Sequence, residues 1–196
     1  MAGRLQGKVA MITGAGSVGA GWGNGRAAAV LFAQEGALVF GVDRDPASME
    51  ETAERIREAG GRFATVECDV TDAASVARAV EACQRGFGRI DVLVNNVGGS
   101  AAGGPVELAE EVWDRQIAVN LKSVFLTCKH VLPIMEAQGG GAVVNVASTS
   151  GIRWTGSAQV AYAASKAMRP GCRADAGRRA HRVVSCDGAS RQGRPA

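Results

Sequence analysis

A glycine-rich segment between an apolar run and a helical run restricts the fold of this chain more than any other feature. Residues Thr13–Gly25 read TGAGSVGAGWGNG and hold six glycines. Glycine accepts positive φ and lets the backbone approach a ligand closely, and the N–H groups at a helix N-terminus attract phosphate. No Gly-Lys-Ser/Thr sequence follows, which argues against a P-loop. A strand, a glycine-rich turn and a helix in this order predict a dinucleotide-binding unit, and a merely flexible loop is the alternative.

Short apolar runs alternate with helix-length segments along most of the chain. The runs that predict strands are Val9–Thr13, Ala37–Val42, Arg62–Glu67, Ile90–Val94 and Ala142–Ala147. The segments that predict helices are Arg26–Glu35, Pro46–Ala59, Ala73–Arg85, Glu111–Met135 and a last one that carries Tyr162 and Lys166, and Pro133 should bend or fray the end of the fourth. Strands separated by helices pair in parallel, because right-handed crossovers cover both faces of the sheet. We therefore expect a single-domain α/β protein with a doubly wound parallel sheet.

Composition excludes several classes of protein. Hydrophobic residues make up 46% and charged residues 21% of the 196 residues, which is enough apolar content for one core. The net charge of +3 is too small to indicate nucleic-acid binding. Five scattered Cys without a CxxC pair, and only two His, support neither a disulfide framework nor a metal site. The first eight residues lack the apolar core of a signal peptide, and no apolar run approaches the ~20 residues of a membrane span, so we expect a cytoplasmic protein without a membrane partner.

The composition changes sharply near Met168. Residues 169–196 hold seven Arg against two Asp, a net charge of +5, which leaves −2 for residues 1–168. Apart from valine, this tail has no large apolar residue, so we expect residues 1–168 to form the domain and 169–196 to be a disordered Arg/Gly/Ala-rich tail. Out-of-frame reading of a GC-rich gene would produce such a bias, and a genuine basic tail is the alternative. Nucleic-acid binding by the tail is disfavoured because it lacks aromatic residues for base stacking.

Asp43 ends the second predicted strand, where dinucleotide-binding folds place an acidic residue. A carboxylate there accepts hydrogen bonds from the ribose hydroxyls of NAD and repels the additional phosphate of NADP. We therefore predict NAD as the cofactor, with NADP less favoured. Arg44 could pair with that phosphate instead, and Asp43 could also be an ordinary capping or solvated turn residue.

A second group of candidate residues is Tyr162-Ala163-Ala164-Ser165-Lys166, preceded by Ser148. Positions four apart share one face of a helix, so Tyr162 and Lys166 can converge on one ligand. A nearby cation favours the ionised form of a phenol, which suits it to proton transfer. Most Tyr–Lys pairs are only surface or core pairs, but Tyr162 is the only tyrosine in the chain and it follows a dinucleotide-binding pattern.

Together these motifs resemble the short-chain dehydrogenase/reductase family. The resemblance rests on the Thr13–Gly25 turn, Asp69-Val70, Asn95-Asn96-Val97-Gly98, Asn120, Ser148, and Tyr162 with Lys166, in family order over about residues 5–168. It implies a Rossmann-like fold, apparently cut short or frameshifted after Met168. It also implies an NAD(P)-dependent oxidoreductase that interconverts a secondary alcohol and a ketone. A non-catalytic, truncated nucleotide-binding remnant is the competing reading.

The resemblance implies a role for each matching residue. Tyr162 would be the general acid/base, Ser148 would hold the substrate oxygen, and Asn120 would position a water in the proton relay. Lys166 would bind the nicotinamide ribose and ease the loss of the Tyr162 proton. Ser148 stands three positions before Gly151, as the family serine does, with Thr149 as the runner-up. The remaining cofactor contacts implied are Gly14, Gly19, Gly23, Gly25, Asp43, Asp69 at the adenine, Val70 and Asn95, together with Tyr162 and Lys166.

Two departures from the family pattern matter. The glycine-rich turn carries an apparent insertion around Val18–Trp22, so Gly23 and Gly25 can serve as its second and third glycines, with Gly19 and Gly21 as the alternative register. After Lys166, Arg169-Pro170-Gly171 should stop the helix one turn later, and nothing afterwards restores the family's substrate lid. The alcohol is therefore unnamed: a 3-oxoacyl thioester, a sugar or a steroid would fit. A homo-oligomer is expected of an intact family member.

Overall fold

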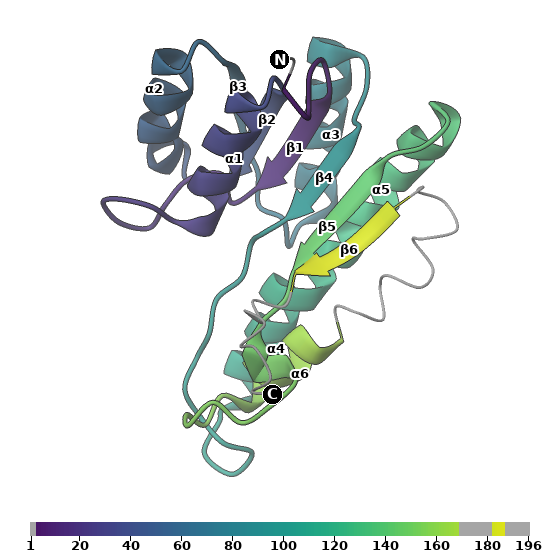
Figure 1. Ribbon diagram of the computed structural model, residues 1–196. Coiled ribbons are helices and arrows are strands. Elements are labelled where there is room, and N and C mark those ends of the chain that lie inside the picture. The colour runs from purple at the N-terminus through teal and green to yellow at the C-terminus, as the bar shows by residue number, and fades with distance from the viewer. Residues whose placement is uncertain (1–2, 169–181, 187–196) are drawn as a thin grey trace, which may run out of the picture.

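A computed structural model describes residues 3–168 and the backbone of residues 182–186. Its centre is one parallel sheet with the strand order β3-β2-β1-β4-β5-β6 (Figure 1). The strands are β1 (Val9–Thr13), β2 (Leu38–Asp43), β3 (Arg62–Glu67), β4 (Val92–Asn95), β5 (Ala142–Val146) and β6 (Arg182–Cys186). The expected doubly wound α/β fold is confirmed.

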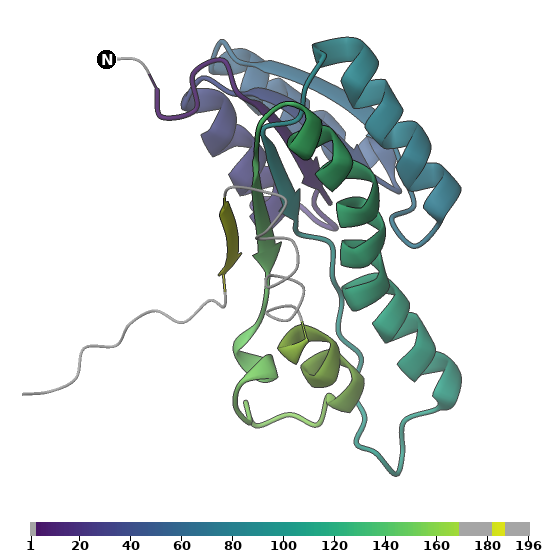
Figure 2. The same cartoon turned by 90° about the vertical axis from the view of Figure 1, so that its right-hand side faces the viewer.

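Helices cover both faces of this sheet. They are α1 (Asn24–Gln34), α2 (Glu50–Glu58), α3 (Ala73–Phe87), α4 (Glu110–Ile117), α5 (Ser123–Ala137) and α6 (Val160–Ala167). Single turns of other helix types are η1 (Pro46–Met49) and η3 (Thr149–Gly151), both 3₁₀, and the π turn η2 (Ala118–Lys122). Helices α1 and α2 lie on one face and α3 and α5 on the other, while α4 and α6 lie beyond the carboxyl ends of the strands (Figures 1 and 2).

Strand β1 divides the core into two layers. Val9 and Met11 belong to the apolar cluster under α3 and α5, whereas Ala10 and Ile12 belong to the cluster under α1 and α2. A strand covered on both faces needs a continuous apolar run, because its side chains alternate between the two layers. This explains why Val9–Thr13 shows no alternation of apolar and polar residues.

The predicted helix Glu111–Met135 is observed as a helix from Glu110 to Ala137. It is α-helical except for one π-helical turn, η2, in its first half. Pro133 lies inside it and does not end it. Proline removes the N–H that would bond to the carbonyl four residues earlier, at Lys129. Lys129 is exposed, so water can satisfy that carbonyl and the helix continues for another turn.

The tail contains a strand that its composition did not predict. Arg182–Cys186 forms β6 and pairs in parallel with β5, with Val183 opposite Val143. These five positions thus form a strand, and the disorder expected of the tail stays a prediction. Two adjacent valines favour a strand, and averaging the composition over the tail hides this local preference. The rest of the predicted tail, residues 169–181 and 187–196, lies outside the described residues.

The long helix also passes a test for membrane spans. Within the described part of the chain, Glu110–Ala137 alone is long and apolar enough to cross a membrane, contrary to the expectation from the apolar runs of the sequence. Its second half buries Val124, Val131 and Met135 in the core against the sheet. Core helices of globular proteins pass the same test for this reason.

Candidate functional site

The carboxyl ends of β1 and β4 meet where the strand order reverses. Thr13 ends β1, and its hydroxyl accepts hydrogen bonds from the backbone N–H groups of Asn96 (3.1 Å) and Val97 (3.3 Å). The Asn96 amide in turn donates to the carbonyl of Gly14 at 3.0 Å. In open α/β sheets, ligands bind in the crevice at this switch point. The glycine-rich turn and the Asn95–Gly98 motif are therefore held together at the expected place.

The geometry of the turn favours one register for its glycines. Gly14 has φ +66°, and a Cβ on Gly25 would lie 1.7 Å from the Gly14 carbonyl oxygen, so both positions require glycine. Gly23 is the N-cap of α1. Gly19 and Gly21 lie in the Val18–Trp22 extension, where a Cβ would meet nothing within 4 Å, but Gly21 has φ +91° and therefore also favours glycine. The close contact at Gly25 favours the register Gly14, Gly23 and Gly25, and the cofactor contacts of all these glycines stay predictions.

The start of α1 suits a diphosphate. No side chain among the described residues caps the N-terminus of this helix, so its first N–H groups are open to a ligand. The absence of Cβ atoms at Gly14 and Gly25 brings the backbone of the turn directly against the helix. Open N–H groups at the positive end of a helix dipole bind anionic groups.

The two acidic cofactor candidates occupy different settings. Asp43 is half-buried at the end of β2, and its carboxylate accepts hydrogen bonds from the N–H groups of Gly16 (3.2 Å) and Asp45 (3.3 Å). Asp69 is exposed, and hydrogen bonds from the hydroxyl and N–H of Thr71 hold the pKa of Asp69 below its usual value. Val70, next to it, is buried. Their contacts with ribose and adenine stay predictions.

Asn95 belongs to the interior of the protein. Its amide donates to the side-chain oxygen of Asn145 at 2.9 Å and accepts from the hydroxyl of Thr127 at 2.7 Å, and only 2% of the residue is exposed. This side chain joins β4 to β5 and α5. The predicted cofactor contact therefore does not fall to the Asn95 side chain, whose polar atoms are engaged inside the fold.

Lys166 and Asn120 converge over Gly98. A Cβ on Gly98 would lie 2.8 Å from Nζ of Lys166 and 2.9 Å from Oδ1 of Asn120, although the two residues come from different elements. Lys166 Nζ donates to the carbonyl of Val146 at 3.1 Å, and Asn120 Oδ1 accepts from the N–H of Gly99 at 3.0 Å. Gly98 was not singled out from the sequence as a site residue. Its place in the Asn-Asn-Val-Gly motif was the available signal.

Tyr162 lies beside Lys166, and Ser148 begins the turn η3, which packs on the same helix. Lys166 Nζ is 5.5 Å from the centroid of the half-buried Tyr162 ring, as the four-residue spacing predicts. Ser148 is the N-cap of η3, and its hydroxyl accepts from the N–H of Ser150 at 3.3 Å. A Cβ on Gly151 would lie 2.7 Å from a backbone nitrogen of α6, so η3 packs directly on the helix that carries Tyr162. Thr149 follows Ser148 in η3, and the choice between their hydroxyls stays a prediction.

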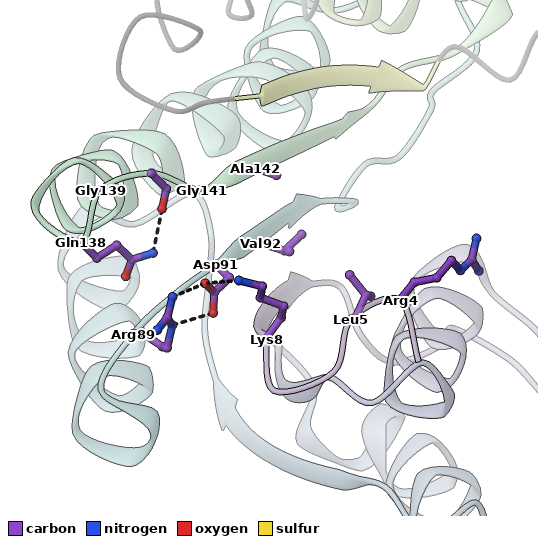
Figure 3. Close-up of a pocket in the computed structure, with 11 residues that line it drawn as sticks. Arg4, Leu5, Lys8, Arg89, Asp91, Val92, Gln138, Gly139, Gly141 and Ala142 are labelled. Atoms are coloured by element: carbon purple, nitrogen blue, oxygen red, sulfur yellow. Dashed lines mark hydrogen bonds and ion pairs between the residues drawn. The ribbon is translucent and has the colours of Figure 1, made fainter. Parts of the chain in front are cut away.

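A charged pocket of about 380 Å³ lies at the opposite, amino end of the strands (Figure 3). Its central group is the Asp91 carboxylate, which pairs with Arg89 (2.6 Å) and Lys8 (3.6 Å). Gln138 bridges the end of α5 to the carbonyls of Ile90 (2.6 Å) and Gly140 (3.0 Å). These polar groups satisfy one another, so the pocket is a structural joint between strands. Among the described residues, no cluster of His, Cys, Asp and Glu could hold a metal.

The sheet order and the glycine cradle define a dinucleotide-binding type of α/β fold. The chain matches the short chain dehydrogenase family over residues 8–175, and it belongs to this family. The match extends past Met168, where the composition changes. Its relatives include proteins named as a reductase and a dehydrogenase.

Two curated relatives show the range of the family. The chain is 42% identical over 164 residues to a 3-oxoacyl-[acyl-carrier-protein] reductase of Thermotoga maritima, covering 84% of this chain and 64% of the relative. It is 41% identical over 163 residues to a D-threitol dehydrogenase of Mycolicibacterium smegmatis, covering 83% of this chain and 60% of that protein. The chain thus spans less than two thirds of the length of these relatives.

Solved structures of short-chain dehydrogenases also resemble this chain. A short-chain dehydrogenase/reductase from Burkholderia xenovorans is 55% identical, with a TM-score of 0.88 over 94% of this chain and 74% of the other. Carveol dehydrogenase from Mycobacterium avium, solved in complex with NAD, is 31% identical, with a TM-score of 0.80 over 87% of this chain and 65% of the other.

Proposed function

We propose that the protein is an NAD-preferring oxidoreductase that interconverts a secondary alcohol and a ketone. The observation that carries the proposal is the convergence of Lys166 Nζ and Asn120 Oδ1 over Gly98, beside the Tyr162 ring. A nicotinamide cofactor would supply the hydride acceptor or donor. The open N–H groups of α1 and the Asp43 carboxylate would hold its diphosphate and ribose. The related carveol dehydrogenase, solved in complex with NAD, supports a nicotinamide cofactor.

The chain's own residues would move the proton. Tyr162 takes the hydroxyl proton of the alcohol or returns it to the ketone oxygen. Ser148 donates a hydrogen bond to the same substrate oxygen and fixes its position. Lys166 is held by the Val146 carbonyl with its Nζ 5.5 Å from the centroid of the Tyr162 ring, where it would bind the nicotinamide ribose. Asn120 is fixed by Gly99, which orients its amide for a water in the proton relay.

Removing the Tyr162 hydroxyl tests this mechanism. Tyr162→Phe keeps the ring and its packing, so NADH binding should be preserved while turnover falls by about 10²–10⁴-fold, the usual contribution of a general acid/base. Binding is measured by titration with NADH, and turnover on a panel that includes a 3-oxoacyl thioester, sugars and steroids. Near-normal turnover in Tyr162→Phe would contradict the mechanism.

A matched pair of variants separates the neighbouring hydroxyls. Ser148→Ala should lower turnover, whereas Thr149→Val, which keeps the side-chain shape, should retain it. The reverse result would assign the role to Thr149. Tight NADH binding by the unmodified chain without turnover on any alcohol would instead support the nucleotide-binding, non-catalytic alternative. Homo-oligomerisation and a cytoplasmic location stay predictions for the whole protein.

A further inference from the structure

Arg26 is a buried cation that the proposed mechanism does not use. It lies in the first turn of α1, directly after Gly25, and is 3% exposed. A cation at the N-terminus of a helix is disfavoured by the helix dipole, so its burial there needs strong compensation. The groups that compensate for the buried charge of Arg26 therefore indicate its role.

All three guanidinium nitrogens of Arg26 are engaged within the protein. Nε donates to the hydroxyl of Thr52 at 3.2 Å, and Nη2 donates to the carbonyl of Ser48 at 3.3 Å. Nη1 donates to the carbonyl of Gly21 and to the carboxylate of Glu51. With these donors engaged, Arg26 is not expected to contact a phosphate directly. It can act only through the segments it joins.

Those segments are the extension of the glycine turn, η1 and α2. Gly21 lies in the Val18–Trp22 extension. The Thr52 hydroxyl donates a hydrogen bond to the carbonyl of Ala15, at the start of the turn, at 3.0 Å. Ser17 N–H also bonds to the carbonyl of Ser48 at 3.3 Å. Through Thr52 and Ser48, η1 and α2 therefore hold the start of the turn, and Arg26 ties the extension to the same support.

Further side chains pack around Arg26 and its partners, an assembly that we call the Arg26 joint. The Arg55 guanidinium lies 4.5 Å from the centroid of the Trp22 ring and bonds to the Glu51 carboxylate at 2.6 Å. Glu51 thus bridges Arg26 and Arg55, and the hydrogen bond from Arg55 is the main cause that holds the pKa of Glu51 below its usual value. The inserted residues of the turn are anchored on α2 by contacts of the chain's own side chains.

We propose that Arg26 is a positioning residue that holds the elongated glycine turn in the conformation that receives the cofactor diphosphate. The same turn carries the Gly16 N–H, which donates to the Asp43 carboxylate at 3.2 Å. The Arg26 joint therefore also supports the residue proposed to bind the ribose. This inference rests on the proposed dinucleotide binding. It predicts that loss of Arg26 weakens the contact with the diphosphate while leaving the proton-transfer residues intact.

The test compares Arg26→Met with Arg89→Met in the full chain. Arg26→Met should speed amide hydrogen exchange in residues 15–22 without ligand. It should also weaken NADH binding by about 10- to 100-fold, the scale for losing charge-assisted hydrogen bonds. Binding of adenosine, which lacks the diphosphate, should change much less, and turnover at saturating NADH should be retained. Arg89→Met loses the 2.6 Å ion pair with Asp91 at the opposite end of the sheet and should leave NADH affinity unchanged.

Three outcomes would overturn the inference. Unchanged NADH affinity and exchange in Arg26→Met would show that the joint does not position the turn. Equal losses for adenosine and NADH together with a lowered melting temperature would show a merely structural role. An unmodified chain that binds no NADH would overturn the proposed function and this inference with it, whereas failure of Arg26→Met alone leaves the proposed function standing.

Discussion

Asp43 combines two tasks in one carboxylate. It accepts the Gly16 N–H, which orders the glycine turn, and it is also the group that we propose selects NAD. Asp43→Asn separates the tasks, because the amide oxygen can still accept from Gly16 while the negative charge is lost. We expect the preference for NAD over NADP to narrow, since a neutral side chain no longer repels the additional phosphate. The ratio of the two dissociation constants measures this, and a ratio identical to that of the unmodified protein would remove Asp43 as the selector.

Some residues of the candidate site could be predicted from the sequence, and others could not. The Tyr162–Lys166 pair was predictable because helical spacing fixes which residues share a face, and both side chains come from α6. Arg26 and Gly98 were not, because their partners lie on other elements. Thr52 is 26 residues from Arg26, and only the folded chain brings the two together. Asn95 was assigned to the cofactor by family resemblance, but local spacing could not reveal its buried bonds to Thr127 and Asn145.

At the scale of elements, the junction between β1 and α1 depends on one glycine. In Gly25→Ala the new Cβ would overlap the Gly14 carbonyl, where the distance is 1.7 Å, so the turn or the helix must shift. Overpacking of this kind costs about 1–3 kcal/mol of unfolding free energy. We expect a lower melting temperature and loss of NADH binding. Gly86→Ala, in α3, is the control: its Cβ would meet nothing within 4 Å, and both properties should be retained.

The elements themselves were largely predictable, and the errors have physical causes. Arg62–Glu67 was predicted with the observed bounds, because glycines before it and a change of pattern after it mark both ends. The interruption of the long helix was missed, since apolar residues continue at three- and four-residue steps through the π turn. Strand β6 was missed because pairing with β5, a contact between distant segments, stabilises a short run that composition alone disfavours.

For the molecule as a whole, Asp91 joins the amino ends of the central strands. Its carboxylate accepts from the Val9 N–H at 2.9 Å and from Arg89, while its carbonyl accepts from the Ala142 N–H at 2.8 Å. Burial acts to raise the pKa of Asp91, but hydrogen bonds from Arg89 and Val9 and the nearby positive charges outweigh it and hold this pKa below its usual value. The ionised form thus stabilises the folded state.

Asp91→Asn should lower the unfolding free energy near neutral pH by about 1.5–3 kcal/mol, the scale for hydrogen bonds to a charged group. Because the folded-state pKa is depressed, this contribution is present above the unfolded-state pKa of about 3.9 and disappears as the pH falls through the folded-state value. Urea unfolding of both proteins at about pH 7 and about pH 3 measures the change. A difference that stays constant with pH would contradict the assignment. Glu81→Gln, in an exposed ion pair with Arg85, should have little effect at either pH.

The π turn η2 makes the number of residues in this part of the long helix critical. Ser123 bonds back to the carbonyl of Ala118, five residues earlier, and its hydroxyl satisfies the carbonyl of Val119 at 2.6 Å. Such a turn amounts to one inserted residue, and each residue of an α-helix adds a rotation of about 100°. Deleting any one residue here would rotate α5 against α4, so either the sheet would lose its apolar cover or Asn120 would turn away from Gly99. Apart from Asn120, residues 118–122 can therefore exchange side chains far more readily than they can tolerate a deletion.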